Sequence, residues 1–231
     1  MMDSNRPPAR ENDAPAGAVP GDRRRRRHDV KREAVLAAAL ELFNTRGFRA
    51  TSLDDVAARL GVTKPTIYHY IGSKDEILFD CVKRGLNMVR DAAESVHARG
   101  GTGRDRLEAL MHSYALAMTQ DYCRCVTRTA DSELTEDSRR AFRKLKREID
   151  DMVRAVVQAG MDDGSIRAGD ARIVTFTLTG SLNWIGRWFE PSRQISAEAA
   201  AAGVVATLMA GLATRPAQDA DAAAPASTVS A

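Results

Sequence analysis

The chain has 231 residues, and the 44% that are apolar suffice for one large hydrophobic core or two small ones, which excludes a disordered polymer. Charged residues make up 28% of the chain but leave a net charge of only +3, so any strong preference for an anionic partner must come from where the charges lie. Residues 23–74 carry twelve basic and five acidic side chains, a local net charge of +7, and the segments on either side are slightly acidic.

The cysteine content and the lack of long apolar runs predict a cytoplasmic protein without a metal or cofactor. Three cysteines, Cys81, Cys123 and Cys125, form neither a disulfide framework nor a tetrahedral metal set. No apolar run approaches the roughly 18–20 residues of a membrane span, and the first residues lack the apolar stretch of a secretory signal. We therefore expect no membrane association.

Both ends of the chain are predicted to be disordered tails, a basic one over residues 1–28 and a second over 214–231. These segments are rich in Pro, Ala, Gly and Asp and contain few large apolar side chains. Ordering them would cost more conformational entropy than burial could return. The folded part is predicted to comprise a domain over residues 29–75 and a larger domain over 76–213.

The first folded segment is predicted to contain three helices and the start of a fourth. An apolar stripe at helical spacing runs from Ala34 to Phe43, and Gly47 ends it. Capping signals at Ser52, Thr63 and Ser73 then open helices over 53–60, 64–70 and 73–96.

Five further helices are predicted at about 104–119, 122–131, 137–160, 170–188 and 196–213, about nine in all. The β-branched run over 173–179 could form a strand, but a lone strand would have no partner, and helical spacing continues from Val174 to Phe189. The fold class is therefore all-α.

Two short helices joined by a glycine-containing turn, 53–60 and 64–70, predict a helix-turn-helix. The second helix has a dense set of hydrogen-bonding and aromatic side chains, and only Ile67 is directed toward a core. Together with the local charge of +7, which includes Arg23–Arg27, this favours double-stranded DNA as the partner.

Residues 33–78 resemble the DNA-binding domain of TetR-type repressors, on segments 34–43, 47–52, 56–57, 60–71 and 72–78. The resemblance implies an all-helical homodimer in the bacterial cytoplasm, nucleoid-associated when bound, with three helices reading DNA and a larger ligand-binding and dimerisation domain. It also implies that Lys64, Thr66 and Tyr70 face base edges, with Tyr68 and Lys74 on phosphates. The full predicted DNA-binding set is Thr51, Ser52, Thr63, Lys64, Pro65, Thr66, Tyr68, His69, Tyr70 and Lys74.

The arginine run Arg23–Arg27 is predicted to be a flexible arm that enters the minor groove or follows the phosphates, and a solubilising tail is the alternative. Tyr68 and Tyr70 could equally be core aromatics, and Lys74 a plain surface lysine.

Residues 104–213 contain both tryptophans and five of the eight methionines, enough for a core and a small-molecule pocket. Residues 183–192 resemble the Trp-(Tyr/Phe)-x-Pro segment of a TetR subgroup that controls lipid, steroid and acyl-CoA catabolism. The resemblance implies a hydrophobic acid or its coenzyme A thioester as effector. Arg128 and Arg187 would pair with its anionic group, although surface ion pairs with Asp131, Glu133 or Glu190 are the alternative. The candidate ligand-binding set is Tyr114, Met118, Tyr122, Arg128, Phe176, Trp184, Arg187 and Trp188.

Small residues repeat at helical spacing along the last helix, which predicts a subunit interface shared with helix 170–188 and hence a near-palindromic operator. Intramolecular packing of the same stripe is the alternative.

The whole pattern predicts a ligand-responsive transcriptional repressor and not an enzyme, because no catalytic motif is present. An architectural DNA-binding protein without a ligand remains the other hypothesis, and redox sensing through Cys123 and Cys125 a weaker one.

Overall fold

The computed structural model describes residues 20–96, 100–191 and 195–212. Within these ranges the chain is helical and contains no strand, which confirms the all-α prediction and places residues 173–179 in a helix. The elements are α1 Pro20–Arg46, α2 Leu53–Leu60, α3 Lys64–Tyr70, α4 Lys74–Glu94, α5 Gly103–Met118, α6 Asp121–Arg128, the 3-10 helix η1 Asp131–Glu133, α7 Glu136–Asp162, α8 Ala171–Trp188 and α9 Ala197–Gly211.

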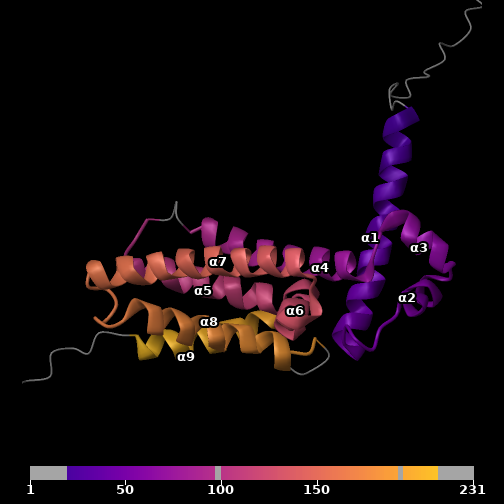
Figure 1. The fold of residues 1–231 in the computed structure, drawn as a ribbon. Helices are drawn as coiled ribbons and strands as arrows, with labels where there is room; N and C mark the ends of the chain where they lie inside the picture. The colour runs from indigo at the N-terminus through magenta and orange to yellow at the C-terminus, as the bar shows by residue number, and fades with distance from the viewer. Residues whose placement is uncertain (1–19, 97–99, 192–194, 213–231) are drawn as a thin grey trace, which may run out of the picture.

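The helices form two groups that share α4 (Figure 1). Helices α1 to α3 lie at one end of the molecule, and α4 runs from them into an elongated bundle made with α5 to α9. Within the bundle α4 packs on α5, α6 and α7, α8 packs on α5, α6 and α7, and α9 packs on α5. α6 also contacts α1, so it lies at the junction of the two groups.

The predicted capping residues begin the helices where the sequence places them. Ser52 and Asp55 form a capping box at the start of α2, since the Ser52 hydroxyl accepts from the Asp55 amide while the Asp55 carboxylate accepts from the Ser52 amide. The Ser73 hydroxyl accepts from the Glu76 amide at the start of α4. Gly61 ends α2 in the left-handed conformation, with φ +65°, which an L side chain adopts only with strain.

The N-terminal boundary of the first helix differs from the prediction. α1 begins at Pro20, so the expected disorder of residues 1–28 is wrong for residues 20–28, and the arginine run is part of a helix instead of a flexible arm. Arginine is a good helix former, proline is tolerated in a first turn, and a nucleated helix gains a hydrogen bond for each residue added. Residues 1–19 and the predicted tail 214–231 lie outside the described residues.

The start of α5 and the end of α7 meet at two glycines, Gly103 and Gly160. This contact gives a first prediction. A Cβ built on Gly103 would overlap the backbone of Gly160, so Gly103→Ala must push α5 and α7 apart. We expect the free energy of unfolding to fall by about 1–3 kcal/mol. Gly100→Ala, before α5 with open space around its Cβ position and no positive φ, should instead leave stability equal or slightly higher. Urea denaturation of both variants checks this, and equal midpoints would contradict it.

Candidate DNA-binding surface and effector cavity

The helix-turn-helix is built from a small buried set and a short turn. Leu53, Val56 and Ala57 of α2 are buried against α1, and Ile67 is the single buried residue of α3. The amide of Gly61 donates to the Ala57 and Ala58 carbonyls, which closes α2 three residues before α3 starts. α3 is therefore held by one buried side chain, and the rest of its surface is available to a partner.

The outer face of α3 carries most of the predicted DNA-contacting residues. Lys64, Pro65, Tyr68 and His69 are exposed, and Thr66 is half-buried. The Lys64 ammonium lies 2.8 Å from the Asp54 carboxylate of α2, and this hydrogen bond raises the pKa of Lys64. Lys64 is thus a charged group at the protein surface that pairs with an exposed carboxylate of α2.

Two residues of the predicted DNA-binding set, Thr51 and Ser52, have side chains that already form hydrogen bonds within the protein. Thr51 is 2% exposed and its hydroxyl donates to the Gly47 carbonyl at 2.9 Å, so the prediction that Thr51 offers its side chain to DNA is not supported by this structure. Its position in the loop before α2 buries it under α1. Ser52 is exposed, but its hydroxyl is 2.6 Å from the Asp55 carboxylate in the capping box. The hydroxyls of Thr63 and Thr66 lie 2.9 Å apart.

Tyr70 and Lys74 are packed more closely than a surface prediction implies. Tyr70 is half-buried, with its ring centroid 5.1 Å from that of His28 in α1. The Lys74 ammonium lies 4.1 Å from the centre of the Phe48 ring, and partial burial lowers the pKa of Lys74. Both residues lie at the edge of the surface that α3 presents, so both stay in the predicted DNA-binding set.

A cavity of about 890 Å³ opens between α4, α5, α6, α7 and α8 in the larger domain. Five of the eight predicted ligand-binding residues line it: Tyr114, Met118, Phe176, Trp184 and Arg187. Buried residues of three helices, α4, α6 and α7, add to its apolar lining: Leu86, Val89, Cys123, Phe142 and Ile149. The cavity has the size of a small-molecule site, but eight of its 24 lining residues are charged, more than the predicted apolar pocket implies.

The cavity wall holds one neutral polar pair, formed by the buried Tyr114 and the exposed Asn183. The Tyr114 hydroxyl donates to the Asn183 side-chain carbonyl at 2.9 Å. Burial raises the pKa of Tyr114, so its phenol stays protonated at neutral pH. The pair thus offers neutral hydrogen-bonding groups between the apolar lining and the open side of the cavity, suited to a carbonyl or amide.

The mouth of the cavity is basic, which sequence analysis missed. Six cationic side chains line it: Arg143, Lys146, Arg147 and Arg154 from α7 and Arg172 and Arg187 from α8. Asp131 accepts from Arg143 and Lys146, and Arg154 pairs with Asp150 and Asp151. Among the described residues Arg147 and Arg172 form no ion pair within 4.0 Å, although Arg172 acts electrostatically on Asp150 and lies 5.5 Å from the centre of the Phe176 ring.

The signal for this basic mouth was present in the spacing along α7. The four cations of α7 that line the cavity lie three, one and seven positions apart, which places them on one side of the helix. Such a run is indistinguishable from an ordinary solvated face until the position of the neighbouring helix is known.

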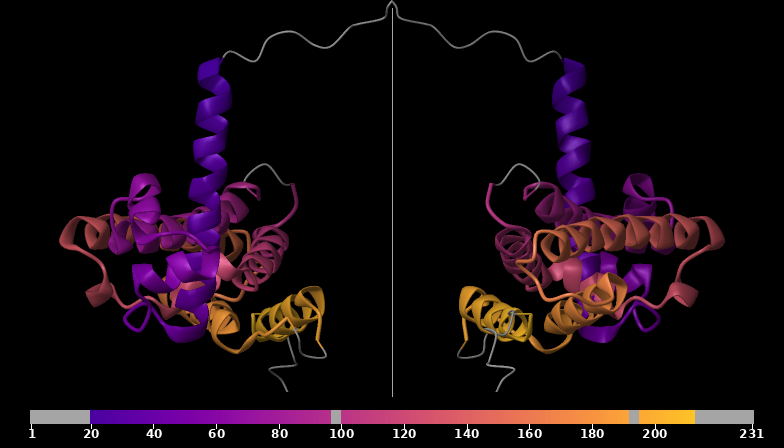
Figure 2. Two further views of the ribbon diagram at one scale, coloured as in Figure 1. Left: turned by 90° about the vertical axis from the view of Figure 1, so that its right-hand side faces the viewer. Right: turned by 90° about the vertical axis from the view of Figure 1, so that its left-hand side faces the viewer.

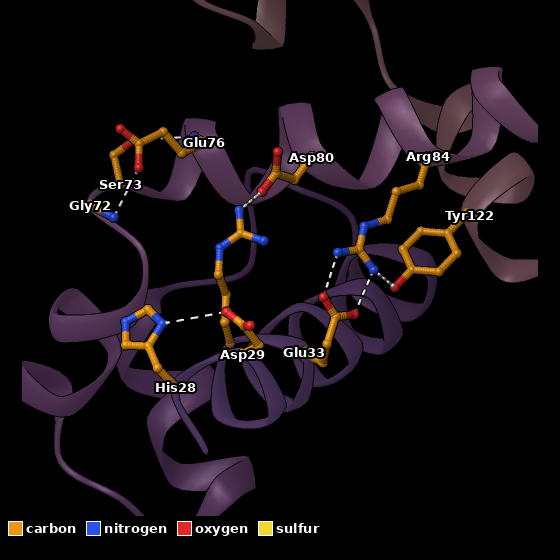
Figure 3. Close-up of polar contacts among 10 residues, drawn as sticks. His28, Asp29, Glu33, Gly72, Ser73, Glu76, Asp80, Arg84 and Tyr122 are labelled. Carbon is orange, nitrogen blue, oxygen red and sulfur yellow. Dashed lines mark hydrogen bonds and ion pairs between the residues drawn. The ribbon is translucent and has the colours of Figure 1, made fainter. Parts of the chain in front are cut away.

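Three predicted ligand-binding residues lie elsewhere. The Arg128 guanidinium donates to the Asn44 carbonyl at 2.6 Å, and the Asn44 amide donates to the Asp121 carbonyl at 2.9 Å, so Arg128 ties α6 to the end of α1. Partial burial lowers the pKa of Arg128. The Tyr122 hydroxyl accepts from Arg84 at 3.3 Å, and Arg84 also donates to Glu33 of α1 at 2.5 and 2.6 Å (Figure 3).

Trp188 is the third such residue and lines a groove on the outer side of α8 and α9. The predictions for Tyr122, Arg128 and Trp188 are therefore wrong for the cavity, because helical spacing fixes a face but not the neighbour that this face meets. Arg187 lines the cavity and donates to the Thr127 carbonyl.

The outer faces of α8 and α9 are apolar and uncovered. Trp184 is 64% exposed, and Phe176 and Ile173 are also more than half exposed. The small-residue stripe predicted on the last helix is exposed throughout: Ala199, Ala202, Gly203, Ala206, Ala210 and Gly211. Intramolecular packing of this stripe, the alternative reading, is therefore wrong.

Groups that would support other chemistry are unfavourably placed or missing in the described ranges. Burial raises the pKa of Cys123 and of Cys125 to about 12, so both remain thiols, while the reactive form is the thiolate. Across the described residues no three His, Cys, Asp or Glu side chains gather into a possible metal site. No helix in those same ranges is long and apolar enough to cross a membrane.

Comparison with known proteins identifies the family. Residues 35–81 match the family described as bacterial regulatory proteins, tetR family, and residues 100–212 match the tetracyclin repressor-like C-terminal domain. The two matches cover both helical groups of the structure. The chain belongs to the TetR family of helix-turn-helix transcriptional regulators.

Relatives and a solved structure match over most of their length. The transcriptional repressor KstR2 of Rhodococcus jostii is 25% identical over 186 residues, 79% of this chain and 91% of KstR2. The transcriptional activator FasR of Mycolicibacterium smegmatis is 27% identical over 201 residues, 86% of this chain and 90% of FasR. The crystal structure of AibR in complex with isovaleryl coenzyme A and operator DNA has a TM-score of 0.69 and 26% identity, covering 77% of this chain and 97% of AibR.

The Lys64–Asp54 pair generates a second prediction. Because Lys64 must leave Asp54 to reach DNA, and because Asp54 is itself repelled by phosphate, Asp54→Asn should strengthen DNA binding by roughly two- to fivefold. Fluorescence anisotropy with a labelled duplex at fixed salt measures this. Asp137→Asn removes an equally exposed carboxylate from α7 and should change nothing. Equal affinities of the Asp54 variant and the unaltered protein would contradict the prediction.

Proposed function

We propose that this protein is an effector-responsive transcriptional repressor that binds a near-palindromic operator as a homodimer and leaves it when a coenzyme A thioester fills the cavity. The observation that carries the proposal is the cavity itself. An apolar interior with unpaired arginines at its mouth stands in a chain whose other end is a helix-turn-helix. The two ends share α4, so one can respond to the other.

DNA is read by the exposed face of α3. Lys64 reaches guanine O6 or N7 in the major groove, while Tyr68 donates to a phosphate and fixes the register of the helix. Thr66 and His69 lie on or beside the same face, and Pro65 and Thr63 bring the start of α3 close to the DNA backbone. Ser52 and Lys74 flank this face at the starts of α2 and α4.

A second copy of the chain covers the outer faces of α8 and α9. Large exposed side chains on α8 stand beside an exposed small-residue stripe on α9, an arrangement that lets a second pair of helices approach closely. Nothing lies within 4 Å of a Cβ built on Gly180 of α8 or on Gly203 of α9, so both glycines leave room for a neighbour. A two-fold dimer presents α3 twice, which requires an operator with two-fold symmetry.

The effector is an amphiphile with a polyanionic head. A free carboxylic acid has one charge and would need one arginine, whereas Arg147 and Arg172 both lie in the cavity lining without an ion-pair partner among the described residues and can accept more than one anionic group. Three of the other four cations already pair with Asp131, Asp150 or Asp151, so these two arginines are the main sites for phosphate. The acyl group enters the apolar interior, and the neutral Tyr114–Asn183 pair in the cavity wall meets the thioester or an amide.

The alternative function is an architectural DNA-binding protein without a ligand. Such a protein needs a basic helix-turn-helix and a dimer surface, but not a cavity of about 890 Å³ reaching across five helices. The cavity favours the effector-responsive function. Redox sensing through Cys123 is disfavoured because the thiol is buried and protonated.

A third prediction tests DNA recognition. Replacing both Lys64 and Tyr68 by alanine removes a base contact and a phosphate contact, so affinity for an operator selected from a random duplex library should fall by at least tenfold. Lys144→Ala, an exposed lysine of α7, is the matched control. Circular dichroism and thermal melting establish that the double variant is folded. Retained sequence selectivity in that folded variant would refute the proposed recognition helix.

A fourth prediction tests the effector class. Isovaleryl coenzyme A, free coenzyme A and isovalerate are titrated against the protein–operator complex, and only the thioester should release DNA at micromolar concentration. The double variant R147A/R172A should need at least tenfold more thioester, because two unpaired cations at the mouth are lost. Arg167→Ala, exposed and outside the cavity lining, is the control. Release by isovalerate at the same concentration would indicate a free acid, and no binding of any of the three would favour the architectural alternative.

A further inference from the structure

The first part of α1 extends far beyond the hydrophobic core of the DNA-binding domain. α1 begins at Pro20; among its residues whose burial is described, the first buried one is Val35, and Val30 is 68% exposed. Figures 1 and 2 show this part of α1 as a rod that projects away from the other helices. It includes the arginine run Arg23–Arg27.

The projecting rod contacts the recognition helix through aromatic rings. The His28 ring centroid lies 5.1 Å from that of Tyr70 and 5.9 Å from that of His69, with interplanar angles of 54° and 72°. His69 and Tyr70 are themselves in edge contact at 5.0 Å. The Lys31 ammonium, one turn along α1, is 5.8 Å from the Tyr70 ring. These residues form a cluster at the C-terminal end of α3, which we name the His28 cluster.

α3 has few other restraints. It has seven residues and one buried side chain, Ile67, and its cap residue Thr63 makes no side-chain bond to the helix backbone. Ile71, which directly follows α3, is also buried. A short helix held along one buried side can still tilt about that side, and such tilting would move Lys64 and Tyr68 relative to the bases. The His28 cluster adds an anchor outside the core at the C-terminal end of α3.

We propose that His28 is a positioning residue for DNA recognition, which joins the basic rod of α1 and the recognition helix into one rigid unit. His28 touches neither base nor phosphate in this role and acts through Tyr70 and His69. The unit fixes the angle at which α3 enters the groove, and it holds the arginine run at a constant place beside the same duplex. This inference rests on DNA reading by α3, as proposed above.

DNA-binding measurements can distinguish His28 as an anchor of α3 from His28 as a cationic contact to phosphate. Loss of the ring should weaken binding to the selected operator and leave binding to random duplex almost unchanged, because phosphate attraction does not need an exact helix angle. Aromatic pairs of this kind are worth roughly a three- to tenfold change in an equilibrium constant. A cationic phosphate contact would instead weaken both duplexes and flatten the salt dependence.

The test uses the full chain and three variants. His28→Ala should lose roughly three- to tenfold in operator affinity with random-duplex affinity within about twofold and an unchanged salt slope. His28→Phe keeps a ring of similar reach without the imidazole nitrogens and should restore operator affinity. Val30→Ala, on the same exposed rod, should match the unaltered protein. Thermal melting of each variant checks that the fold is unaffected.

Several outcomes would overturn the proposal: operator affinity unchanged in His28→Ala, equal losses on both duplexes, or no rescue by His28→Phe. Failure of the proposed function gives a different result, since the unaltered protein would then select no operator from the library.

Discussion

The close approach of α4 and α6 is the constraint on which the rest of the structure depends. A Cβ built on Gly85 of α4 would lie 2.5 Å from the Tyr122 carbonyl oxygen of α6, so the two backbones touch only because residue 85 has no side chain. The Cys123 thiol donates to the Gly85 carbonyl at 3.3 Å at the same place. This contact lets two helices from different parts of the chain form one wall of the cavity.

Adjacent residues at this contact face opposite ways. Gly85 and Cys123 line the cavity, while their neighbours Arg84 and Tyr122 bond each other on the side of α1, where Arg84 also donates to Glu33 (Figure 3). The Arg84 hydrogen bonds hold the pKa of Glu33 below its usual range, so this carboxylate is charged at neutral pH and pairs across the junction. One helical residue therefore separates the ligand-facing surface from the surface that carries the DNA-binding domain.

Much of the fold could be predicted because caps and stop residues are local signals. Ser52, Gly61 and Ser73 act where sequence spacing places them, and α8 is helical because its period continues beyond its β-branched run. The site was predicted less well. Whether Arg128 or Arg147 reaches the cavity depends on which helix packs opposite, and that is a long-range property that no local pattern contains.

The start of α1 shows a second limit of the sequence prediction, because here the structure is more ordered than the composition indicated. Composition argued against order in residues 20–28 because they have little to bury, yet a helix that is already nucleated can extend without burial. Such an extension costs little and gains contacts where its side chains meet another element, as His28 does at Tyr70. A sequence argument based on the core alone overlooks this kind of order.

The polar contacts between the two groups of helices are individually weak, which suits a reversible switch. They include Asn44 with Asp121 and Arg128, Glu33 with Arg84, Arg32 with Asp80, and Arg49 with Glu133. Each such bond contributes of the order of 1 kcal/mol net, less for the partly exposed ion pairs. Coupling between two ligands of a regulator is typically about 1–3 kcal/mol. In the proposed function, rearranging two or three of these bonds would therefore suffice to couple effector to DNA, whereas a fully apolar junction of the same size would hold the two domains in one arrangement.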